Sequence, residues 1–285
     1  MRPGEHAKLQ VRSRLKARAE LVRGKPALAE SYHEAPLKIA KTFPLHDEAG
    51  PQLAVVHMDV SPGLMDGDRY AYDWRIGEGV RLYATNQAYT RVHPCPYDAA
   101  KVEQRFVLER DAVLEWLPEP VMLYRDAHYE CVTEVDLSPG SICVIGEALA
   151  PGRISRGERF AFRCSDTKLA VRHNGELIHY QRQRLLPDKM SLAAPGSFGS
   201  YTHLASLYVF SDKIGPELAD RLAGVMEESC PEGVVWSVAR TAKLGVVAML
   251  AGNRGWQLQR LLTLAWDETR RQLLSAPPLR LIGHA

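Results

Sequence analysis

Alternation of apolar and polar residues near the start of this chain restricts its fold more than any other feature. From residue 9 to residue 21 the odd positions are apolar or small, and the even positions are charged or polar. Side chains of a β-strand point to opposite faces with a period of two, so this segment is predicted to be one strand, or two abutting strands, with one buried face. The pattern recurs in shorter runs that begin at Tyr70, Val102, Tyr129 and Phe160. The first 210 residues therefore predict a body of many short strands.

Turn sequences separate these runs. Residues 61–63, 77–79 and 138–140 are Gly-containing turns of this kind. Asn174-Gly175 is the most specific signal, because both residues tolerate the positive φ of a type I′ turn, and it predicts a hairpin with residues 168–173 and 176–184 as arms. Frequent turns between many strands indicate a β-sandwich, a barrel or a β-helix-like solenoid. The chain shows no fixed-period motif of a regular repeat protein.

Residues 211–285 have helical spacing instead. Apolar residues recur at intervals of three and four in residues 214–229 and, more clearly, in residues 255–274, so two helices are predicted. Two strands are predicted between them, at residues 234–239 and 246–250. No Gly/Ser-rich or Pro-rich linker separates the two halves. We expect one domain, 1–285, in which a mostly β body (1–210) carries a helix–strand–strand–helix element (211–285) packed on it.

Composition narrows the class of protein. The 36 Lys and Arg residues nearly balance the 34 Asp and Glu residues of this 285-residue chain, which argues against a dedicated nucleic-acid binder. The five cysteines are odd in number and form no CxxC pair, so reduced thiols are expected. The longest apolar run, residues 244–251, is far shorter than the roughly 20 residues of a membrane span. Residues 1–25 lack the apolar core of a signal peptide. We therefore expect a soluble, cytoplasmic protein.

Carboxylates mark two segments. Asp66 and Asp68 stand two residues apart in the loop of residues 61–68, where they can serve acid–base chemistry or bind a metal, or simply shape a turn. Gly152 and Arg153 begin a second polar cluster that ends at Glu158. Arg153 can form a salt bridge there with Glu147 or Glu158 in a bend between strands, or the cluster can bind a ligand.

Residues 85–95 carry many hydrogen-bonding side chains. If the segment is extended, Thr85, Gln87 and Tyr89 share one face, which must line a polar cavity, face solvent or belong to a satisfied network. His93 and Cys95 also share a face and can ligate nickel or zinc; the alternative is a surface histidine and a small buried cysteine. The basic positions of the first strand offer a docking surface for an acidic partner, or a merely solvated face: Arg12, Arg14, Lys16 and Arg18.

Catalytic signatures such as HExxH, GxSxG, a P-loop or a GxGxxG turn do not occur. Six segments in order resemble the urease accessory protein family UreD, also called UreH, over residues 35–274. They are residues 35–43, 61–68, 85–91, 115–120 with Pro118, 152–158, and Trp266 with Arg270 and Arg271. The loop at Leu64-Met65-Asp66 and the presence of Asn86 resemble the Bacillus-type branch. Residues 279–285 lack the family's frequent Arg-Ile-Trp ending.

The resemblance implies a largely β scaffold with C-terminal helices rather than an enzyme. Such proteins bind UreF and, through it, the GTPase UreG; the assembly docks on apo-urease and helps insert nickel. The resemblance implies no tightly bound cofactor, Ni²⁺ in transit through an internal passage, no contact with nucleic acid or membrane, and allows a dimer within the accessory complex.

Site residues follow from the resemblance together with the polar clusters. Those expected along the nickel passage are Asp66, Asp68, Thr85, Gln87, Glu147 and Glu158, with Arg153 approaching the same space. Those expected to bind partners, chiefly on the exposed face of the last helix, are Arg260, Arg270, Trp266, Arg12 and Arg14. Gly152, Arg153 and Pro118 are expected to be structural.

Two other functions fit the same residues. One is a hydrolase that uses Asp66, Asp68 and Glu147 in a β-sandwich cleft. The other is a non-catalytic β module that binds a partner through its basic strand. A genomic neighbourhood of urease subunits separates the nickel-delivery scaffold from both.

Overall fold

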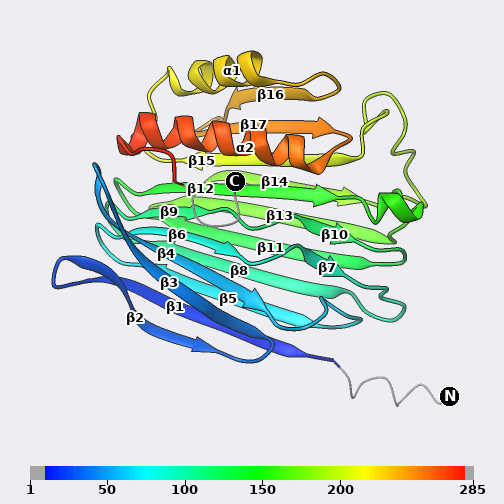
Figure 1. Ribbon diagram of the computed structural model, residues 1–285, viewed down its shortest axis with the longest axis horizontal. Coiled ribbons are helices and arrows are strands. Elements are labelled where there is room, and N and C mark those ends of the chain that lie inside the picture. Colours follow the sequence, from blue (N-terminus) through cyan, green and yellow to red (C-terminus); the bar gives the residue numbers. More distant parts are fainter. Residues whose placement is uncertain (1–9, 280–285) are drawn as a thin grey trace.

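Two β-sheets face each other across a buried apolar layer, and the chain passes repeatedly from one to the other (Figure 1). A computed structural model describes residues 10–279, so the predictions for Leu9 and for the tail beyond Leu279 lie outside it. The first sheet has the order β14-β13-β11-β8-β5-β1-β2. Its strands are β1 (Arg12–Val22), β2 (Lys25–His33), β5 (Arg69–Ile76), β8 (Ala100–Leu108), β11 (His128–Leu137), β13 (Cys164–His173) and β14 (Glu176–Leu185).

The second sheet has the order β16-β17-β15-β12-β9-β6-β4-β3, with β7 and β10 paired beside it. Its strands are β3 (Leu37–Asp47), β4 (Gly50–Asp59), β6 (Arg81–Asn86), β7 (Thr90–Val92), β9 (Val113–Trp116), β10 (Val121–Leu123), β12 (Ile142–Ala150), β15 (His203–Phe210), β16 (Val235–Arg240) and β17 (Gly245–Gly252).

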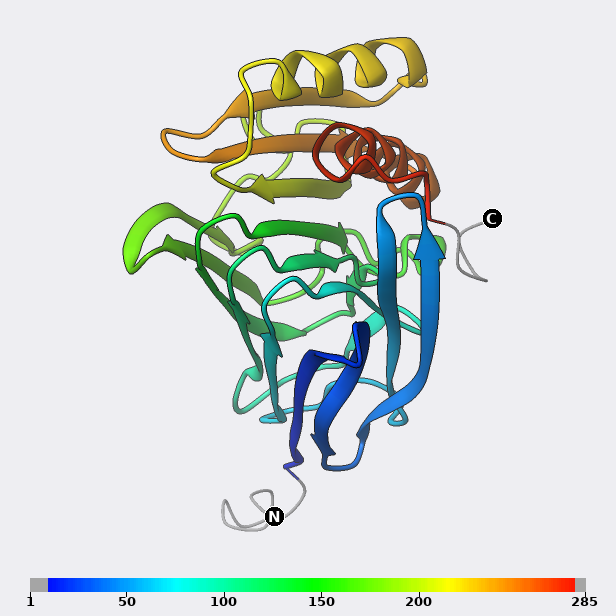
Figure 2. The same ribbon diagram turned by 90° about the vertical axis from the view of Figure 1, so that its left-hand side faces the viewer.

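The middle of the molecule is a solenoid-like winding. Strands β1, β5, β8, β11 and β13 pair in parallel in the first sheet, and β4, β6, β9 and β12 pair in parallel in the second. In sequence, strands of the two sheets alternate, so each parallel neighbour comes one winding later (Figure 2). The prediction of a mostly β, β-helix-like body is confirmed. The connections differ in length from one winding to the next, which agrees with the lack of a fixed-period motif.

Alternation along the strands sorts side chains between the core and the outside. In β1, for example, Leu15, Ala17 and Ala19 are buried, whereas Lys16 is exposed and Arg18 is half-buried. Trp74, Phe106 and Trp116 are among the largest side chains that fill the space between the sheets. Asn174 and Gly175 both have positive φ and join β13 to β14, so the predicted hairpin is confirmed.

The strand predicted from the alternation that begins at Phe160 is wrong. Residues 160–163 are irregular, and Phe160 has a φ of 51°. The apolar spacing there has another cause, since the Phe160 ring contacts the rings of Phe162 and Phe198 in a loop cluster. The strand β13 begins only at Cys164.

The C-terminal element matches its prediction closely. Helices α1 (Leu218–Ser229) and α2 (Gly255–Thr269) pack on the extension of the second sheet formed by β15, β17 and β16, at the end of the molecule opposite β1 and β2 (Figure 1). A π-helical turn, Arg270–Leu274, continues α2. A second apolar cluster lies between helices and sheet, and it includes Leu222, Met226, Leu258, Leu261 and Ala265. No helix within residues 10–279 is long and apolar enough to cross a membrane.

Candidate functional site

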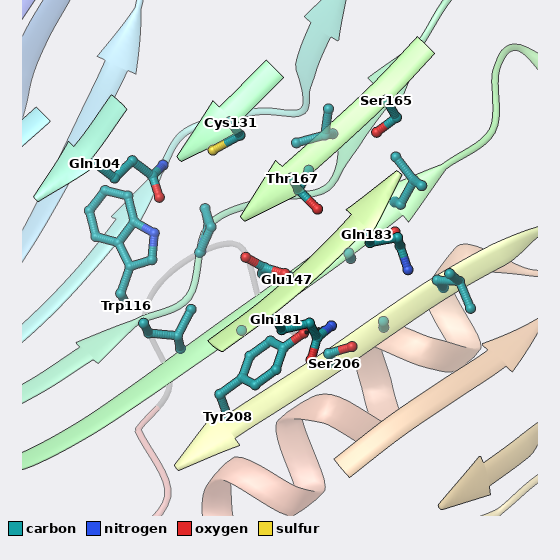
Figure 3. A pocket seen from close by; sticks show the side chains of 18 of the residues that line it. Gln104, Trp116, Cys131, Glu147, Ser165, Thr167, Gln181, Gln183, Ser206 and Tyr208 are labelled. Atoms are coloured by element: carbon teal, nitrogen blue, oxygen red, sulfur yellow. Dashed lines mark hydrogen bonds between the residues drawn. The ribbon is translucent and has the colours of Figure 1, made fainter. Parts of the chain in front are cut away.

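An internal chamber between the two sheets surrounds the carboxyl group of Glu147 (Figure 3). We call it the Glu147 chamber; its volume is about 90 Å³. Glu147 lies on β12 and points toward side chains of the facing sheet. The lining of the chamber includes the carboxyl group of Glu119 and the neutral polar side chains of Gln104, Tyr129, Cys131, Ser165, Thr167, Gln181, Gln183, Ser206 and Tyr208. Of the described residues that line it, none is Lys or Arg, so its fixed charge is negative.

The Glu147 carboxyl group has no protein partner among residues 10–279. Loss of bulk water around it raises its pKa to about 7, because an ionised carboxylate is poorly stabilised without solvent or a counter-ion. An unpaired carboxylate without bulk solvent costs stability, and a strongly perturbed pKa inside a cavity marks a candidate functional site. The arrangement is suited to attracting a cation.

Strand pairing explains the polar wall of this chamber. Cys131 of β11 is paired with Thr167 of β13, and Thr167 with Gln183 of β14, so inward positions of three strands form one row. Gln181 donates a hydrogen bond of 2.8 Å to the Tyr208 hydroxyl of β15, which links the two sheets at this edge. The inward positions of β8 and β11 are otherwise mostly apolar, and Gln104 interrupts them.

A second chamber adjoins the first. This loop-side chamber, of about 320 Å³, is lined by His57 and Asp59 of β4, by residues 61–64 and by residues 86–91. Gln104, Trp116, Pro118, Glu119, Val121 and Tyr129 line both chambers. The two chambers are therefore neighbouring parts of one interior space.

A third, smaller pocket lies on the other side of the second sheet, under α2. This helix-side pocket shares Pro118, Glu119, Gly146, Glu147 and Ala148 with the Glu147 chamber. Its remaining walls include Tyr83, Trp266 and Gln259, and the Gln259 amide donates to Glu119 Oε2 at 3.1 Å. Glu147 and Glu119 thus stand where the interior meets the helices.

Asp66 and Asp68 hold the backbone rather than line these chambers. Asp68 is buried, and its two oxygens accept hydrogen bonds from the backbone N–H of Val11 and of Met65, both at 2.8 Å. Asp66 accepts from the backbone N–H of Tyr97 and Asp98. The expectation that Asp68 shares a space with Glu147 is wrong, because its carboxylate is already engaged at the start of β5.

The segment 85–95 is not one extended strand. Strand β6 ends at Asn86, whose side-chain amide donates to the Ala88 carbonyl at 2.9 Å and turns the chain. As a result, buried Thr85 donates to the Leu117 carbonyl and lines neither chamber, whereas exposed Gln87 lines the loop-side chamber. The expectation that Thr85 and Gln87 share one face is therefore wrong.

His93 and Cys95 match the second alternative given above, in which they are not metal ligands, because both side chains contact backbone carbonyl oxygens. Cys95 is fully buried, donates from Sγ to the His93 carbonyl, and has a pKa raised by that burial. His93 Nε2 lies 3.1 Å from the Pro62 carbonyl oxygen. Within residues 10–279, no group of three or more His, Cys, Asp and Glu side chains is placed to hold a metal ion.

Arg153 pairs with Glu158, which confirms the salt bridge in a bend. Arg153 Nε donates to Glu158 Oε2 at 2.8 Å, and the guanidinium lies 4.1 Å from the centre of the Tyr124 ring. The pairing lowers the pKa of Glu158. Gly152 has a φ of 135°, and a Cβ there would meet the Glu158 carbonyl oxygen. Neither Arg153 nor Glu158 lines the Glu147 chamber, so the expectation that they share its space is wrong.

Two of the residues expected to bind partners on the last helix lie inside the protein instead. Arg270 is 1% exposed and its Nη1 donates to both oxygens of Glu115, at 2.7 and 2.6 Å. Trp266 Nε1 donates to the same carboxylate at 2.6 Å. The prediction that Arg270 points outward is wrong, because its buried side chain anchors the helix to Glu115 of β9. Arg260, by contrast, is exposed.

The basic face of β1 is exposed as expected. Arg12 and Arg14 alternate with buried residues and lie beside Arg69 and Ala71 of β5. Arg18 pairs with Glu20 at 2.5 Å, so part of the positive charge is compensated within the chain. The partner-binding role of Arg12 and Arg14 stays a prediction.

Sequence reasoning missed several residues of the chambers. Gln104, Thr167 and Gln181 occupy inward positions of alternating strands, and a polar residue at such a position is the signal that marks them. His57 gave no signal, because β4 reads as a nearly continuous apolar run whose burial does not follow simple alternation. Neither set could be grouped without knowing which strands face each other.

The fold and the site define a β-solenoid-like protein with C-terminal helices and adjoining chambers whose walls include carboxyl groups. The family model described as "UreD urease accessory protein" matches residues 7–282 of the chain. Urease accessory protein UreD of Acetivibrio thermocellus is 33% identical over 252 residues, which are 88% of this chain and 95% of that protein. UreD 2 of Streptomyces griseus is 30% identical over 210 residues, or 71% and 72% of the two chains. UreD of Haloarcula marismortui is 28% identical over 252 residues, or 88% and 83%. The chain belongs to the UreD family of urease accessory proteins.

Proposed function

We propose that this chain is a non-catalytic scaffold through which Ni²⁺ reaches apo-urease. The observation that carries the proposal is the Glu147 chamber, which holds the unpaired carboxyl group of Glu147, with Glu119 also in its wall, among neutral oxygen and amide groups. A divalent cation is attracted to that charge, while the Gln, Ser and Thr side chains replace part of its hydration shell.

Transit requires weak holding, and the chamber chemistry supplies it. A set of thiolates would bind nickel tightly and release it slowly. Here the only carboxylates that the cation meets are those of Glu147 and Glu119, with waters as its other ligands. The buried thiols of Cys131 and Cys143 have pKa values raised by burial, so they stay protonated and are poor ligands at neutral pH.

The helix-side pocket suggests where the partners bind. We propose that UreF, and through it UreG, docks over α2, so that nickel enters or leaves under that helix. Arg260 and Trp256 are exposed one helical turn apart on α2, and Trp256 is 58% exposed. Exposed Trp and Arg side chains are the types that most often anchor interfaces. The assembly would then act in the reducing cytosol, where five free cysteines are stable.

The hydrolase alternative has less support. Asp66 and Asp68 bind backbone N–H groups, and neither lines the chamber that contains Glu147. An acid–base pair needs two carboxyl groups on one substrate. The β-module alternative keeps its basis in the exposed Arg12 and Arg14, and it is separated by the partner test below.

Two measurements test the proposal. Urease produced in a host without this chain should have low activity and little bound nickel, and the wild-type chain should restore both; full activation without it would contradict the proposal. For the docking surface, Arg260→Glu should weaken co-purification with UreF, because an attractive charge becomes repulsive. The matched control is Arg221→Glu, which makes the same charge change at an exposed position of α1. If Arg260→Glu has no effect and Arg12→Glu/Arg14→Glu does, the basic strand is the docking surface.

A further inference from the structure

The carboxyl group of Glu147 faces an internal space rather than bulk water. Glu147 is half-buried although it lies between the two sheets, so its accessible surface borders the Glu147 chamber and the helix-side pocket. Figure 3 shows its carboxyl group pointing into the chamber, among polar side chains of β13, β14 and β15. An ion without a counter-charge or bulk water is strongly destabilised in a protein interior. A chamber without a cation therefore favours the protonated, neutral form of Glu147.

No cationic side chain of the described chain shares the space around Glu147. The titratable side chains that line the Glu147 chamber or the helix-side pocket are Glu119, Tyr129, Cys131, Tyr208 and, on the helix side, Tyr83. Strands β8, β13 and β14 and helix α2 contribute neutral side chains. Arg91 and His57 line the adjoining loop-side chamber, but neither lines the walls that contain Glu147. A positive charge beside ionised Glu147 must therefore come from outside residues 10–279.

Glu147 is also the acid of this set whose charge changes near neutral pH. Burial raises the pKa of Glu147 to about 7. Burial also raises the pKa values of Tyr129, Cys131 and Tyr208, which are alkaline even in water, so these groups stay protonated. Glu119 accepts a hydrogen bond from a side-chain amide of α2, a donor that Glu147 lacks. A proton lost when a cation arrives would therefore come from Glu147.

We propose that a divalent cation enters the Glu147 chamber in exchange for the proton of Glu147, an inference that rests on the proposed nickel passage. The Glu147 O–H bond breaks and its proton passes to water. The carboxylate oxygen then donates an electron pair to hydrated Ni²⁺ and replaces one of its waters. The chamber volume of about 90 Å³ leaves room for several of the remaining waters.

The exchange makes the holding strength of the chamber depend on pH. When a proton returns to Glu147, the carboxylate–Ni²⁺ bond breaks and the O–H bond forms again, so the cation is released. Loading is therefore favoured as pH rises, and release is favoured as pH falls. No other group has to move for the site to change between its two states.

Calorimetry of the purified full-length chain with Ni²⁺ alone tests the exchange. Titrations at one pH in two buffers with different heats of ionisation give the number of protons released per bound ion. At pH 6 the wild type should release about one proton more per Ni²⁺ than Glu147→Gln, which keeps the shape and lacks the acidic proton. At pH 8 this difference should fall to near zero, because the wild-type carboxyl group has already ionised. Comparison with the variant subtracts protons released by any histidine that binds Ni²⁺ elsewhere.

The matched control is Glu134→Gln, which makes the same change at an exposed carboxylate of β11 and should release as many protons as the wild type. Equal proton release by the wild type and Glu147→Gln at pH 6 would overturn the proposal, and so would a lack of measurable Ni²⁺ binding by the wild type at pH 8.

A measurement on the wild type alone decides the question if Glu147→Gln does not fold. At equal concentrations, paramagnetic Ni²⁺ should broaden the side-chain amide signal of Gln181, which lines the chamber, at pH 8 and much less at pH 5.5. Equal broadening at both pH values would overturn the exchange.

Failure of this inference is distinguishable from failure of the nickel passage. If Glu147→Leu lowers the nickel content of urease but the wild type releases no extra proton, the exchange is lost and the passage remains. If the proton is released but urease matures fully without the chain, the passage is lost and the exchange remains.

Discussion

Glu147 carries a charge that the fold does not compensate. Its carboxyl group has a pKa raised from 4.5 to about 7 by desolvation. Between these two values the unfolded chain has released this proton and the folded chain still binds it. Folded stability therefore falls as pH rises through that window, and the whole penalty is present above it.

Replacement of this residue should reveal the penalty. Glu147→Gln removes the charge and keeps the shape, so it should raise the free energy of unfolding by up to about 3 kcal/mol at pH 8 and by little at pH 5. Urea denaturation at both pH values measures the difference. Glu134→Gln, on the exposed face of β11, is the control and should change stability little at either pH. An equal effect of Glu147→Gln at both pH values would mean that the carboxyl group is not desolvated.

Arg270 has the opposite character, because its charge is buried and fully paired. It donates to Glu115, its Nη2 lies 3.0 Å from Asp47 Oδ2, and its Nε donates to the Pro277 carbonyl. Arg270→Leu leaves Glu115 as an uncompensated buried ion and should cost about 3–5 kcal/mol of stability.

The control for Arg270→Leu is Arg260→Leu, an exposed position on the same helix that should change stability by no more than about 0.5 kcal/mol. Adding Glu115→Gln should recover part of the loss, since both members of the pair are then neutral. Equal melting temperatures for Arg270→Leu and Arg260→Leu would contradict the buried network.

At the scale of elements, the loop of residues 61–68 forms a wall of the loop-side chamber through its close approach to β7. The Leu64 N–H donates to the Arg91 carbonyl at 2.8 Å, and the His93 N–H donates to the Leu64 carbonyl at 2.9 Å. Gly63 has a φ of 135°, and a Cβ there would lie 2.4 Å from the Arg91 carbonyl oxygen.

Gly63→Ala should therefore cost about 1–3 kcal/mol, because both the backbone conformation and the approach to β7 are disturbed. Gly224→Ala in α1 is the matched control. A Cβ at Gly224 meets nothing within 4 Å, and the change should be neutral or stabilising by up to about 1 kcal/mol. Thermal unfolding of both variants checks this. If Gly63→Ala is as stable as Gly224→Ala, the loop does not depend on contact with β7.

Single elements were predictable where the chain's own pattern decides them. Alternation identified β1, β5, β8 and β11, Asn174-Gly175 identified the β13–β14 hairpin, and helical spacing identified α1 and α2. Prediction failed where a distant partner decides. Helical periodicity placed Arg270 outside, because its partner Glu115 is 155 residues away in sequence. The interpretation of residues 85–95 as one extended segment also missed the turn at Asn86, because that turn depends on one side-chain hydrogen bond.

At the scale of the whole molecule, the winding brings distant strands together into one site. The Glu147 chamber draws residues from β8, β9, β10, β11, β12, β13, β14 and β15. Glu147 was predicted as a site residue, but its neighbours were not, since parallel pairing between strands that are not consecutive leaves no mark in any one strand. The same winding joins the loop-side chamber to the pocket under α2, where the proposed partners dock.

The nickel content of urease matured in the presence of Glu147→Leu tests the central proposal most directly. Desolvation makes this variant at least as stable as the wild type, so a defect would not reflect misfolding. Glu134→Leu, on the outer face of β11, is the control. If the chamber carries nickel, urease matured with Glu147→Leu should contain several-fold less nickel per active site than urease matured with Glu134→Leu, at equal amounts of accessory complex. Equal nickel content with the two variants would contradict a passage through the Glu147 chamber.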